Sequence, residues 1–285
     1  MDTVLRSQSQ TVTIGATQPF CIIGERINPT GRKKLAEELR GGDLSTVEAD
    51  THAQVEAGAD MLDINAGIPL VDEAELLAKM LQTVQAAADI PICIDSSVIE
   101  ALEAGLAVYE GKALVNSVTG EDDRLEEILP LVAKHGAAVI GLANDETGIP
   151  ETPQQRLEIA TKIVSVAGDY GIGPEDIVID PLAMTVGADT EAVTTTLETI
   201  RLIRDTLGVN MCLGASNVSF GLPRRHELNA AFLPMAMAAG LTSAIMSTAQ
   251  VCVDSVRGAD LLLGHDAWGA AWIAEHRARE AVAAS

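Results

Sequence analysis

The chain has few aromatic side chains. Only 2% of its 285 residues are Phe, Trp or Tyr, although 47% of them are hydrophobic. Its core must therefore be built from Val, Ile, Leu, Ala and Met, the kind of residues that dominate the interior of α/β barrels. No uninterrupted apolar run reaches the roughly 18 residues of a membrane span. Residues 1–18 are polar and lack the apolar segment of a secretion signal, so we expect a cytoplasmic protein.

Basic residues are also scarce. The chain has 19 Lys and Arg against 41 Asp and Glu, which gives a formal net charge of −22 at pH 7. This excess of negative charge argues against nucleic acid and anionic membranes as partners. The four cysteines (21, 93, 212 and 252) include no C-x-x-C pair, and the five histidines show no metal-ligand spacing. We interpret the cysteines as small buried hydrophobes and predict neither disulfides nor a metal site.

Apolar runs of strand length alternate with segments of helical periodicity along the chain. Strict alternation predicts parallel strands joined by right-handed crossovers. At 285 residues the chain suits a single-domain α/β protein with the (β/α)8 TIM-barrel fold, for which about 250 residues is usual. The expected strands are residues 20–24, 61–65, 92–95, 113–117, 138–142, 177–180, 211–215 and 243–246. The expected helices include residues 44–57, 73–88, 124–135, 152–170, 190–207 and 228–239.

Three parts of the chain are expected: an N-terminal extension (1–18), the TIM barrel (19–265) and a C-terminal helix (266–285). The Ala-rich terminal helix either covers the barrel bottom or joins a dimer interface. Local signals support the helix boundaries. Gly136 stands just past a predicted helix, as a C′ residue should, and Thr152 is an N-cap candidate with Gln155 at the capping-box position.

Polar side chains stand where five of the apolar runs stop. These runs are LDIN (62–65), ICID (92–95), LVN (114–116), IVID (177–180) and MCLGASN (211–217). A buried parallel strand is a continuous apolar run, so these Asp and Asn residues lie at carboxyl ends of strands, where α/β barrels bind ligands. Asp accepts two parallel hydrogen bonds and Asn both donates and accepts, which suits a flat, nitrogen-rich ring such as a pterin. A phosphorylated sugar fits poorly, because phosphate sites need glycine-rich turns, helix N-termini or basic groups.

Motifs in a fixed order make the chain resemble the pterin-binding barrel superfamily. They are GERINPT (24–30), DMLDINAG (60–67), IDSS (94–97), VNS (115–117), IGL with TGIP (140–142 and 147–150), IDPL (179–182), GASNVS (214–219) and FLPMAMAAGL (232–241). The set is similar to the methyltetrahydrofolate:corrinoid protein methyltransferases and to the folate domain of cobalamin-dependent methionine synthase. The resemblance spans roughly residues 22–263, nearly the whole chain.

The resemblance implies a methyltransferase that moves a methyl group between N5 of tetrahydrofolate and the cobalt of a corrinoid protein, in a direction left open. Tetrahydrofolate or 5-methyltetrahydrofolate is then the substrate. The chain has no Asp-x-His-x-x-Gly cobalt-ligand motif, so the corrinoid (cobalamin) is carried by a partner protein. The family also implies a homodimer.

The same resemblance implies roles for single residues. Asp180 pairs with the 2-amino and N3 edge of the pterin, Asn217 lies near N5, and Arg225 faces the folate tail or the ring. Asn217 and Asp95 are the predicted catalytic residues. The full set predicted to bind the pterin or folate is Glu25, Asn28, Asp63, Asn65, Asp95, Asn116, Asp180, Asn217 and Arg225.

An amide at position 217 suits the chemistry. Breaking the methyl–N5 bond leaves electron density on nitrogen, and a donor aimed at N5 stabilises that density as an oxyanion hole does. Asn cannot supply a full proton, so the proton comes from water or through a network that includes an Asp. Taken singly, Asp95 and Asp180 are also N-cap candidates, Asn28 suits a turn, and Glu25 and Arg26 are placed for a structural ion pair.

Two other functions stay open at this point. Dihydropteroate synthase shares the barrel and pterin pocket, but that family carries a Ser-Arg-Lys type segment where this chain has GASNVS (214–219), without Lys. A non-catalytic folate-binding subunit is the other alternative. In its favour, residues 143–146 (ANDE) are more acidic than expected for the methyltransferases, and residues 247–250 (STAQ) lack an expected acidic residue.

Overall fold

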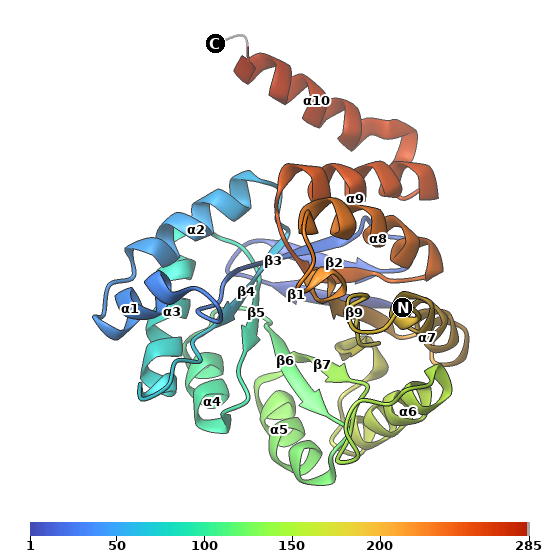
Figure 1. Ribbon diagram of the computed structural model, residues 1–285. Coiled ribbons are helices and arrows are strands. Elements are labelled where there is room, and N and C mark those ends of the chain that lie inside the picture. Colours follow the sequence, from blue (N-terminus) through green and yellow to red (C-terminus); the bar gives the residue numbers. More distant parts are fainter. Residues whose placement is uncertain (284–285) are drawn as a thin grey trace.

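The computed structural model describes residues 1–283, which form a closed barrel of parallel strands inside a ring of helices (Figure 1). The strand order around the barrel is β10-β3-β4-β5-β6-β7-β8-β9. The first and last barrel strands therefore pair with each other, in parallel, with Ser243 opposite Cys21. The predicted (β/α)8 TIM barrel is confirmed.

The barrel strands lie close to their predicted positions. β3 and β6 run past the predicted ends at residues 24 and 117, because the ladder is irregular after Gly24 and after Asn116 and then resumes. The strands are β3 (Cys21–Ile27), β4 (Met61–Asn65), β5 (Ile92–Asp95), β6 (Leu114–Thr119), β7 (Ala138–Leu142), β8 (Ile177–Asp180), β9 (Asn210–Gly214) and β10 (Ser243–Met246).

The helices begin and end where the local sequence signals indicate. Thr152 and Gln155 form the predicted capping box, and Gly136 ends its helix in the left-handed conformation with φ 59°. The helices are α1 (Lys33–Arg40), α2 (Ser45–Glu56), α3 (Glu73–Ala87), α4 (Ile99–Val108), α5 (Asp122–His135), α6 (Pro153–Asp169), α7 (Ala192–Thr206), α8 (Arg225–Ala239), α9 (Gln250–Leu263) and α10 (Ala270–Ala283). Short 3-10 turns are η1 (Pro174–Asp176), η2 (Ala215–Ser219) and η3 (Ala267–Gly269). Among residues 1–283, no helix has both the length and the apolar character needed to cross a bilayer.

The hydrophobic core has two parts. The larger part fills the space between the strands and the surrounding helices. The smaller part fills the barrel itself and includes the side chains of Cys21, Cys93 and Cys212. All four cysteines are buried and free, as predicted, and burial raises the pKa of each thiol. The cysteines thus act as small apolar residues in tightly packed places.

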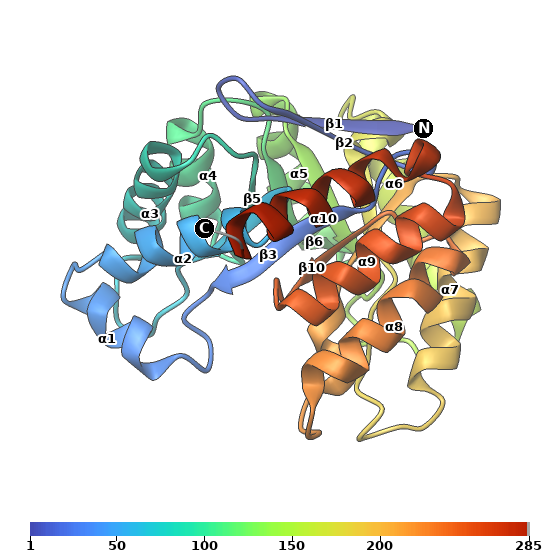
Figure 2. The same ribbon diagram turned by 90° about the horizontal axis from the view of Figure 1, so that it is seen from above.

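A β-hairpin that the sequence did not reveal covers the bottom of the barrel. Its strands are β1 (Asp2–Arg6) and β2 (Thr11–Gly15), which pair in antiparallel fashion. Leu5 and Ile14 enter the barrel core, and Asn210 Nδ2 of β9 donates to the Ile14 carbonyl at 2.8 Å. Figure 2 shows the hairpin along one end of the barrel, opposite the end at which β3 points toward α1.

The C-terminal helix is not needed to close the bottom, because the hairpin already does so. In Figure 1, α10 lies outside α9 at the edge of the molecule. Residues 284 and 285 of the predicted terminal helix lie outside the described residues.

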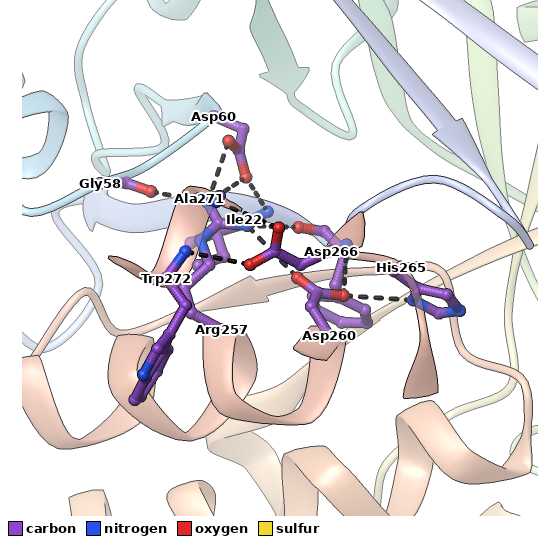
Figure 3. A network of polar contacts seen from close by, with 10 residues as sticks. Ile22, Gly58, Asp60, Arg257, Asp260, His265, Asp266, Ala271 and Trp272 are labelled. Atoms are coloured by element: carbon purple, nitrogen blue, oxygen red, sulfur yellow. Dashed lines mark hydrogen bonds and ion pairs between the residues drawn. The ribbon is translucent and has the colours of Figure 1, made fainter. Parts of the chain in front are cut away.

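A polar network joins α9, the last helix of the ring, to β3, the first strand of the barrel (Figure 3). Arg257 of α9 contacts both carboxylate oxygens of Asp60, at 2.9 and 3.0 Å, and donates to the Phe20 carbonyl at 3.0 Å. Asp60 in turn accepts from the Ile22 amide at 2.8 Å, and Asp260 accepts from the Phe20 amide at 2.9 Å. The network therefore ties α9 to β3 and to the turn before β4, across the seam where the barrel closes.

We expect Arg257→Met to lower the free energy of unfolding by about 2–4 kcal/mol, because it leaves two partly or fully buried carboxylates without their cation. The measurement is chemical denaturation at pH 7. Lys79→Met is the matched control, since the Lys79–Glu75 ion pair lies on the surface of α3 and should be worth at most about 1 kcal/mol. Equal losses in the two variants would contradict the role assigned to Arg257.

Candidate active site

A cavity of about 520 Å³ opens at the carboxyl ends of the barrel strands. Every residue predicted to bind the ligand lines it, except Asn65. The lining residues are Glu25, Arg26, Asn28, Thr30, Arg32, Asp63, Asp95, Asn116, Asp180, Gly214, Ser216, Asn217, Phe220, Arg225 and Ile245. A second cavity, of about 560 Å³, lies beside α6 and contains none of the predicted residues. The strand-end cavity, which we call the ring cavity, is therefore the candidate active site.

The floor of the ring cavity is built by the register of three neighbouring strands. Asn65, Asp95 and Asn116 are successive partners across β4, β5 and β6. Asn65 Nδ2 donates to Asp95 Oδ2 at 3.0 Å, so Asn65 supports a lining residue from behind. Asn116 Nδ2 donates to Asp63 Oδ1 at 3.2 Å. Asp63 and Asp95 thus each receive a hydrogen bond from a neighbouring carboxamide, which fixes the orientation of the carboxylate.

The two floor carboxylates hold protons more tightly than ordinary Asp side chains do. Burial raises the pKa of Asp63 well above its usual range, and the nearby charge of Asp95 raises it further. Burial also raises the pKa of Asp95, although the hydrogen bond from Asn65 opposes this effect. Two carboxylates that share a poorly solvated site cannot both ionise easily. The pair is therefore more easily protonated than two separate, solvated Asp side chains.

Asp180 stands on the opposite side of the floor, at the end of β8. Its Oδ1 accepts from the Leu182 amide at 2.7 Å. Burial raises the pKa of Asp180 to about 7, while the Leu182 amide and the positive charge of Arg156 pull it down. The carboxyl group is therefore poised to change charge near neutral pH.

Sequence reasoning missed Arg156, which supports the site from outside the cavity, as well as the lining residues Thr30, Arg32, Ser216 and Phe220. The Arg156 side chain is 3% exposed, and within residues 1–283 it forms no ion pair. It donates instead to three carbonyls, those of Pro150 at 3.1 Å, Pro181 at 2.9 Å and Leu182 at 2.8 Å. Arg156 thereby joins the loop after β7 to the loop after β8 and holds the segment whose amide orients Asp180. One signal was present in the sequence, because Arg156 falls on the apolar stripe of α6, four residues before the buried Ala160.

Asn217 enters the cavity from η2, just beyond β9. Its side-chain amide has no hydrogen-bond partner in the part of the chain that the structure describes, so it is available to a ligand. Gly214 permits this position, because a Cβ at Gly214 would lie 3.0 Å from Asn217 Nδ2. The neighbouring Ser216 is held in place, since its hydroxyl donates to Glu25 at 2.8 Å and accepts from Asn229 at 3.1 Å. A free amide thus stands on a fixed turn.

The rim residues are engaged with the protein in different ways. Arg225 donates to the Ser216 carbonyl at 2.7 Å and to Ser219 Oγ at 3.2 Å, and lies 5.8 Å from the centre of the Phe220 ring. Asn28 lines the cavity and also forms the turn expected of it, accepting from the Thr30 amide at 2.9 Å.

Arg26 does not pair with Glu25, which was one of the open alternatives. It pairs with Asp50 at 3.5 Å, while Glu25 accepts from Ser216. Burial raises the pKa of Glu25 as well. In residues 1–283, no group of three or more His, Cys, Asp or Glu is placed to hold a metal ion. The site therefore offers carboxyl and amide groups, with arginines only at its rim, and suits hydrogen bonding to a neutral, nitrogen-rich ligand.

Comparison with known proteins identifies the family. Residues 24–247 match the family described as pterin binding enzyme, which is most of the chain. The chain belongs to the pterin-binding enzyme family. A solved dihydropteroate synthase from Stenotrophomonas maltophilia has the same fold, with a TM-score of 0.67 and 17% identity over 91% of this chain and 98% of that one. The Xanthomonas albilineans enzyme gives a TM-score of 0.69 and 18% identity over 91% and 98%. At these identities the likeness concerns the fold alone.

Other known proteins are more similar in sequence. A methylcorrinoid:tetrahydrofolate methyltransferase of Eubacterium limosum is 33% identical over 252 residues, which cover 86% of this chain and 92% of the relative. The methionine synthase of Mycobacterium tuberculosis is 35% identical over 246 residues, 81% of this chain. This chain spans only 20% of that longer protein. The resemblance read from the motifs is thereby confirmed.

We expect Arg156→Met to raise the pKa of Asp180 from about 7 to about 8 or above, because a nearby cation is lost. Arg156→Lys keeps the charge and should leave this pKa nearly unchanged. Carboxyl ¹³C resonances of Asp-labelled protein, followed against pH, measure the shift, and Asp180→Asn identifies the resonance. An unchanged pKa in the Met variant would show that Arg156 only braces the loops.

Proposed function

We propose that this pterin-binding enzyme is a methyltransferase that moves a methyl group between N5 of tetrahydrofolate and the cobalt of a corrinoid held by another protein. The observation that carries the proposal is the ring cavity, in which strand-end carboxyl groups surround one free amide, Asn217. Its relative in Eubacterium limosum, similar over 86% of this chain, is named for that reaction. That name favours transfer from the methylcorrinoid to tetrahydrofolate as the physiological direction.

The pterin ring would lie on the cavity floor. Ionised Asp180 presents two acceptor oxygens, which match the adjacent N–H groups at the 2-amino and N3 edge of the ring. Asp95 and Asn116 face the ring from β5 and β6. Asp95 offers a hydrogen-bond acceptor, and Asn116 offers both a donor and an acceptor. Because Asn65, Asp63 and Leu182 already hold these groups, little side-chain entropy is lost when the ring binds.

Asn217 is assigned to N5, the nitrogen that gains or loses the methyl group. Its amide N–H donates to the electron density that develops on N5 when the N5–methyl bond breaks, and the same contact stabilises the reverse step, because the two directions share one transition state. The Asp63–Asp95 pair is a neighbouring pair of carboxyl groups in the cavity, and the pKa of each is raised. We therefore assign to this pair the exchange of the proton that N5 takes up or gives away.

The corrinoid would supply the nucleophilic or methyl-bearing cobalt, and this chain contributes binding, orientation and polarisation. The cavity rim is compatible with an approaching partner, because Phe220 and Arg26 line the cavity and are exposed. The homodimer implied by the resemblance remains a prediction.

The direct test of the proposal is an anaerobic assay with tetrahydrofolate and methylcobalamin, and with methyltetrahydrofolate and reduced cobalamin. Methyl transfer in either direction supports the proposal, and the ratio of the two rates addresses the direction. Dihydropteroate formation from a pterin pyrophosphate and 4-aminobenzoate is measured in parallel. Robust synthesis there, without methyl transfer, would favour the dihydropteroate synthase alternative. Tight folate binding with neither reaction would favour a non-catalytic subunit.

Asn217→Ala should slow methyl transfer by about 10²–10³-fold, with a smaller loss of tetrahydrofolate affinity, because the amide contact strengthens in the transition state. Single-turnover kinetics and equilibrium binding separate the two effects. Asn217→Asp keeps the size of the side chain but also lacks the donating amide group. Its methyl transfer should therefore be as slow as that of Asn217→Ala. Equal losses of rate and affinity would make Asn217 a binding residue only.

Tetrahydrofolate affinity should rise as the pH increases from about 5.5 to 7 and level off above 7. Asp180, with a pKa of about 7 in the free protein, is neutral at low pH and must ionise to accept both ring N–H groups. The nearby Cys212 thiol stays neutral throughout, because burial raises its pKa. Asp180→Asn should weaken binding by about 1–3 kcal/mol at pH 7.5 and remove the rise. Calorimetric titrations at several pH values check this prediction. A rise in affinity that persists in the variant would mean that another titrating group causes it.

A further inference from the structure

The first barrel strand contains an extra residue at the edge of the ring cavity. Gly24 and Ile27 of β3 pair with the residues on either side of Asp63 in β4. Two residues of β3, Glu25 and Arg26, therefore stand opposite the single residue Asp63. An insertion of this kind is a β-bulge, which bends the strand and changes the direction of the side chains that follow. We call it the β3 bulge.

The β3 bulge decides which way Ile27 points. Successive side chains of a strand alternate between its two faces. Cys21 and Ile23 lie in the core inside the barrel, and Glu25 follows them on the same face and lines the ring cavity. In a regular strand Ile27 would be the next side chain on this inner face. It lies instead in the outer core, between the strands and the helices. The bulge thus keeps an apolar side chain out of a polar cavity.

The same change of direction occurs on β6, three strands further round the barrel. Leu114 lies in the core inside the barrel, and Asn116 follows it on the inner face and lines the ring cavity. Between Asn116 and Val118, β6 has one residue more than β7. Val118 consequently lies in the outer core. In both strands, an extra residue at the cavity edge turns the next apolar side chain outward.

One buried side chain of α2 holds the β3 bulge. Gln54 is 2% exposed, and its Oε1 accepts from the Arg26 amide at 2.8 Å. Arg26 has no partner in the ladders with β4 and β10. Gly24 leaves room for this contact, because a Cβ there would lie 2.4 Å from Gln54 Oε1. Gln54 Nε2 has no hydrogen-bond partner within residues 1–283. The acceptor oxygen is therefore the part of this side chain that the structure uses.

We infer that Gln54 is a positioning residue of the active site, which keeps the ring cavity open by holding Ile27 outside it. The inference rests on the proposed function, because the ligand in question is tetrahydrofolate in the ring cavity. Gln54 does not line that cavity, so it acts through the backbone of β3. Without its acceptor, the Arg26 amide loses its partner, and the regular ladder becomes the better-paired arrangement. A one-residue change of register then turns Ile27 inward.

Gln54→Met removes the acceptor and keeps the volume of the side chain. It should weaken tetrahydrofolate binding by about 10-fold, roughly the value of one lost hydrogen bond. Gly24→Ala should have a similar effect, because its methyl group displaces Gln54 Oε1 from the other side. Thr51→Val is the matched control. Thr51 is buried on the same helix, but its hydroxyl donates to the Val47 carbonyl within α2, so this variant should bind with native affinity.

Ile27→Ala separates a role in shaping the cavity from a general role in stability. Alone, this change should lower the melting temperature, because Ile27 is fully buried, and should leave the affinity close to native. Combined with Gln54→Met, it should restore most of the lost affinity, since a methyl group takes up little of the cavity. If Gln54 only stabilised the fold, the two losses of stability would add and no affinity would return.

The test is calorimetric titration of each folded variant with tetrahydrofolate, below its melting temperature. Hydrogen exchange of the Arg26 amide is measured in parallel without ligand. Restored affinity in the double variant, with faster exchange in Gln54→Met, supports the inference. If Gln54→Met does not fold, Gly24→Ala replaces it in the comparison with Ile27→Ala.

Two results would overturn the inference and leave the proposed function intact. One is native affinity in Gln54→Met, and the other is a loss of affinity that Ile27→Ala does not reverse. Failure of the native protein to bind tetrahydrofolate would refute the proposed function instead. The exchange rate of the Arg26 amide would then still decide whether Gln54 holds the β3 bulge, because that measurement needs no ligand.

Discussion

Closure of the parallel barrel is the constraint on which the rest of the structure depends. When β10 pairs with β3, every strand is paired on both sides and all carboxyl ends face the same way. The pairing joins segments more than two hundred residues apart, and Arg257 reinforces the seam through Asp60 and the backbone of β3. Without closure, the polar strand ends would lie on an open, twisted edge, and Asp63 and Asp180 would not border one cavity.

Burial gives these strand ends their chemistry. The same carboxyl groups at a solvated surface would be fully ionised at pH 7 and would bind a neutral ring weakly. At the bottom of the cavity the charged form loses hydration, so Asp63, Asp95 and Asp180 all have raised pKa values. Neighbouring amides and Arg156 limit the effect and set different values on the two sides of the floor. The pKa is about 6 for Asp95 and about 7 for Asp180, while that of Asp63 lies well above its usual range.

The sequence predicted the strands and the polar set because both are local features. Asp63, Asn116 and Asp180 directly follow apolar runs, and in a parallel barrel that position alone determines which end of the strand they occupy. The register that pairs Asn65 with Asp95 could not be predicted, because it depends on how neighbouring strands slide. Arg156 was missed since its partners are backbone carbonyls far away in the chain. The hairpin was missed because its strands are short and only Leu5 and Ile14 enter the core.

The hairpin at the base has a consequence for the order of events. It fills one end of the barrel with apolar side chains, so ligands can reach the cavity only from the other end. On the proposed function, the flat ring goes to the floor and the bulky corrinoid carrier must come to rest above it. The two reactants therefore enter through the same opening, one after the other. The ring has to arrive before its partner docks, and it can leave only after the carrier has withdrawn.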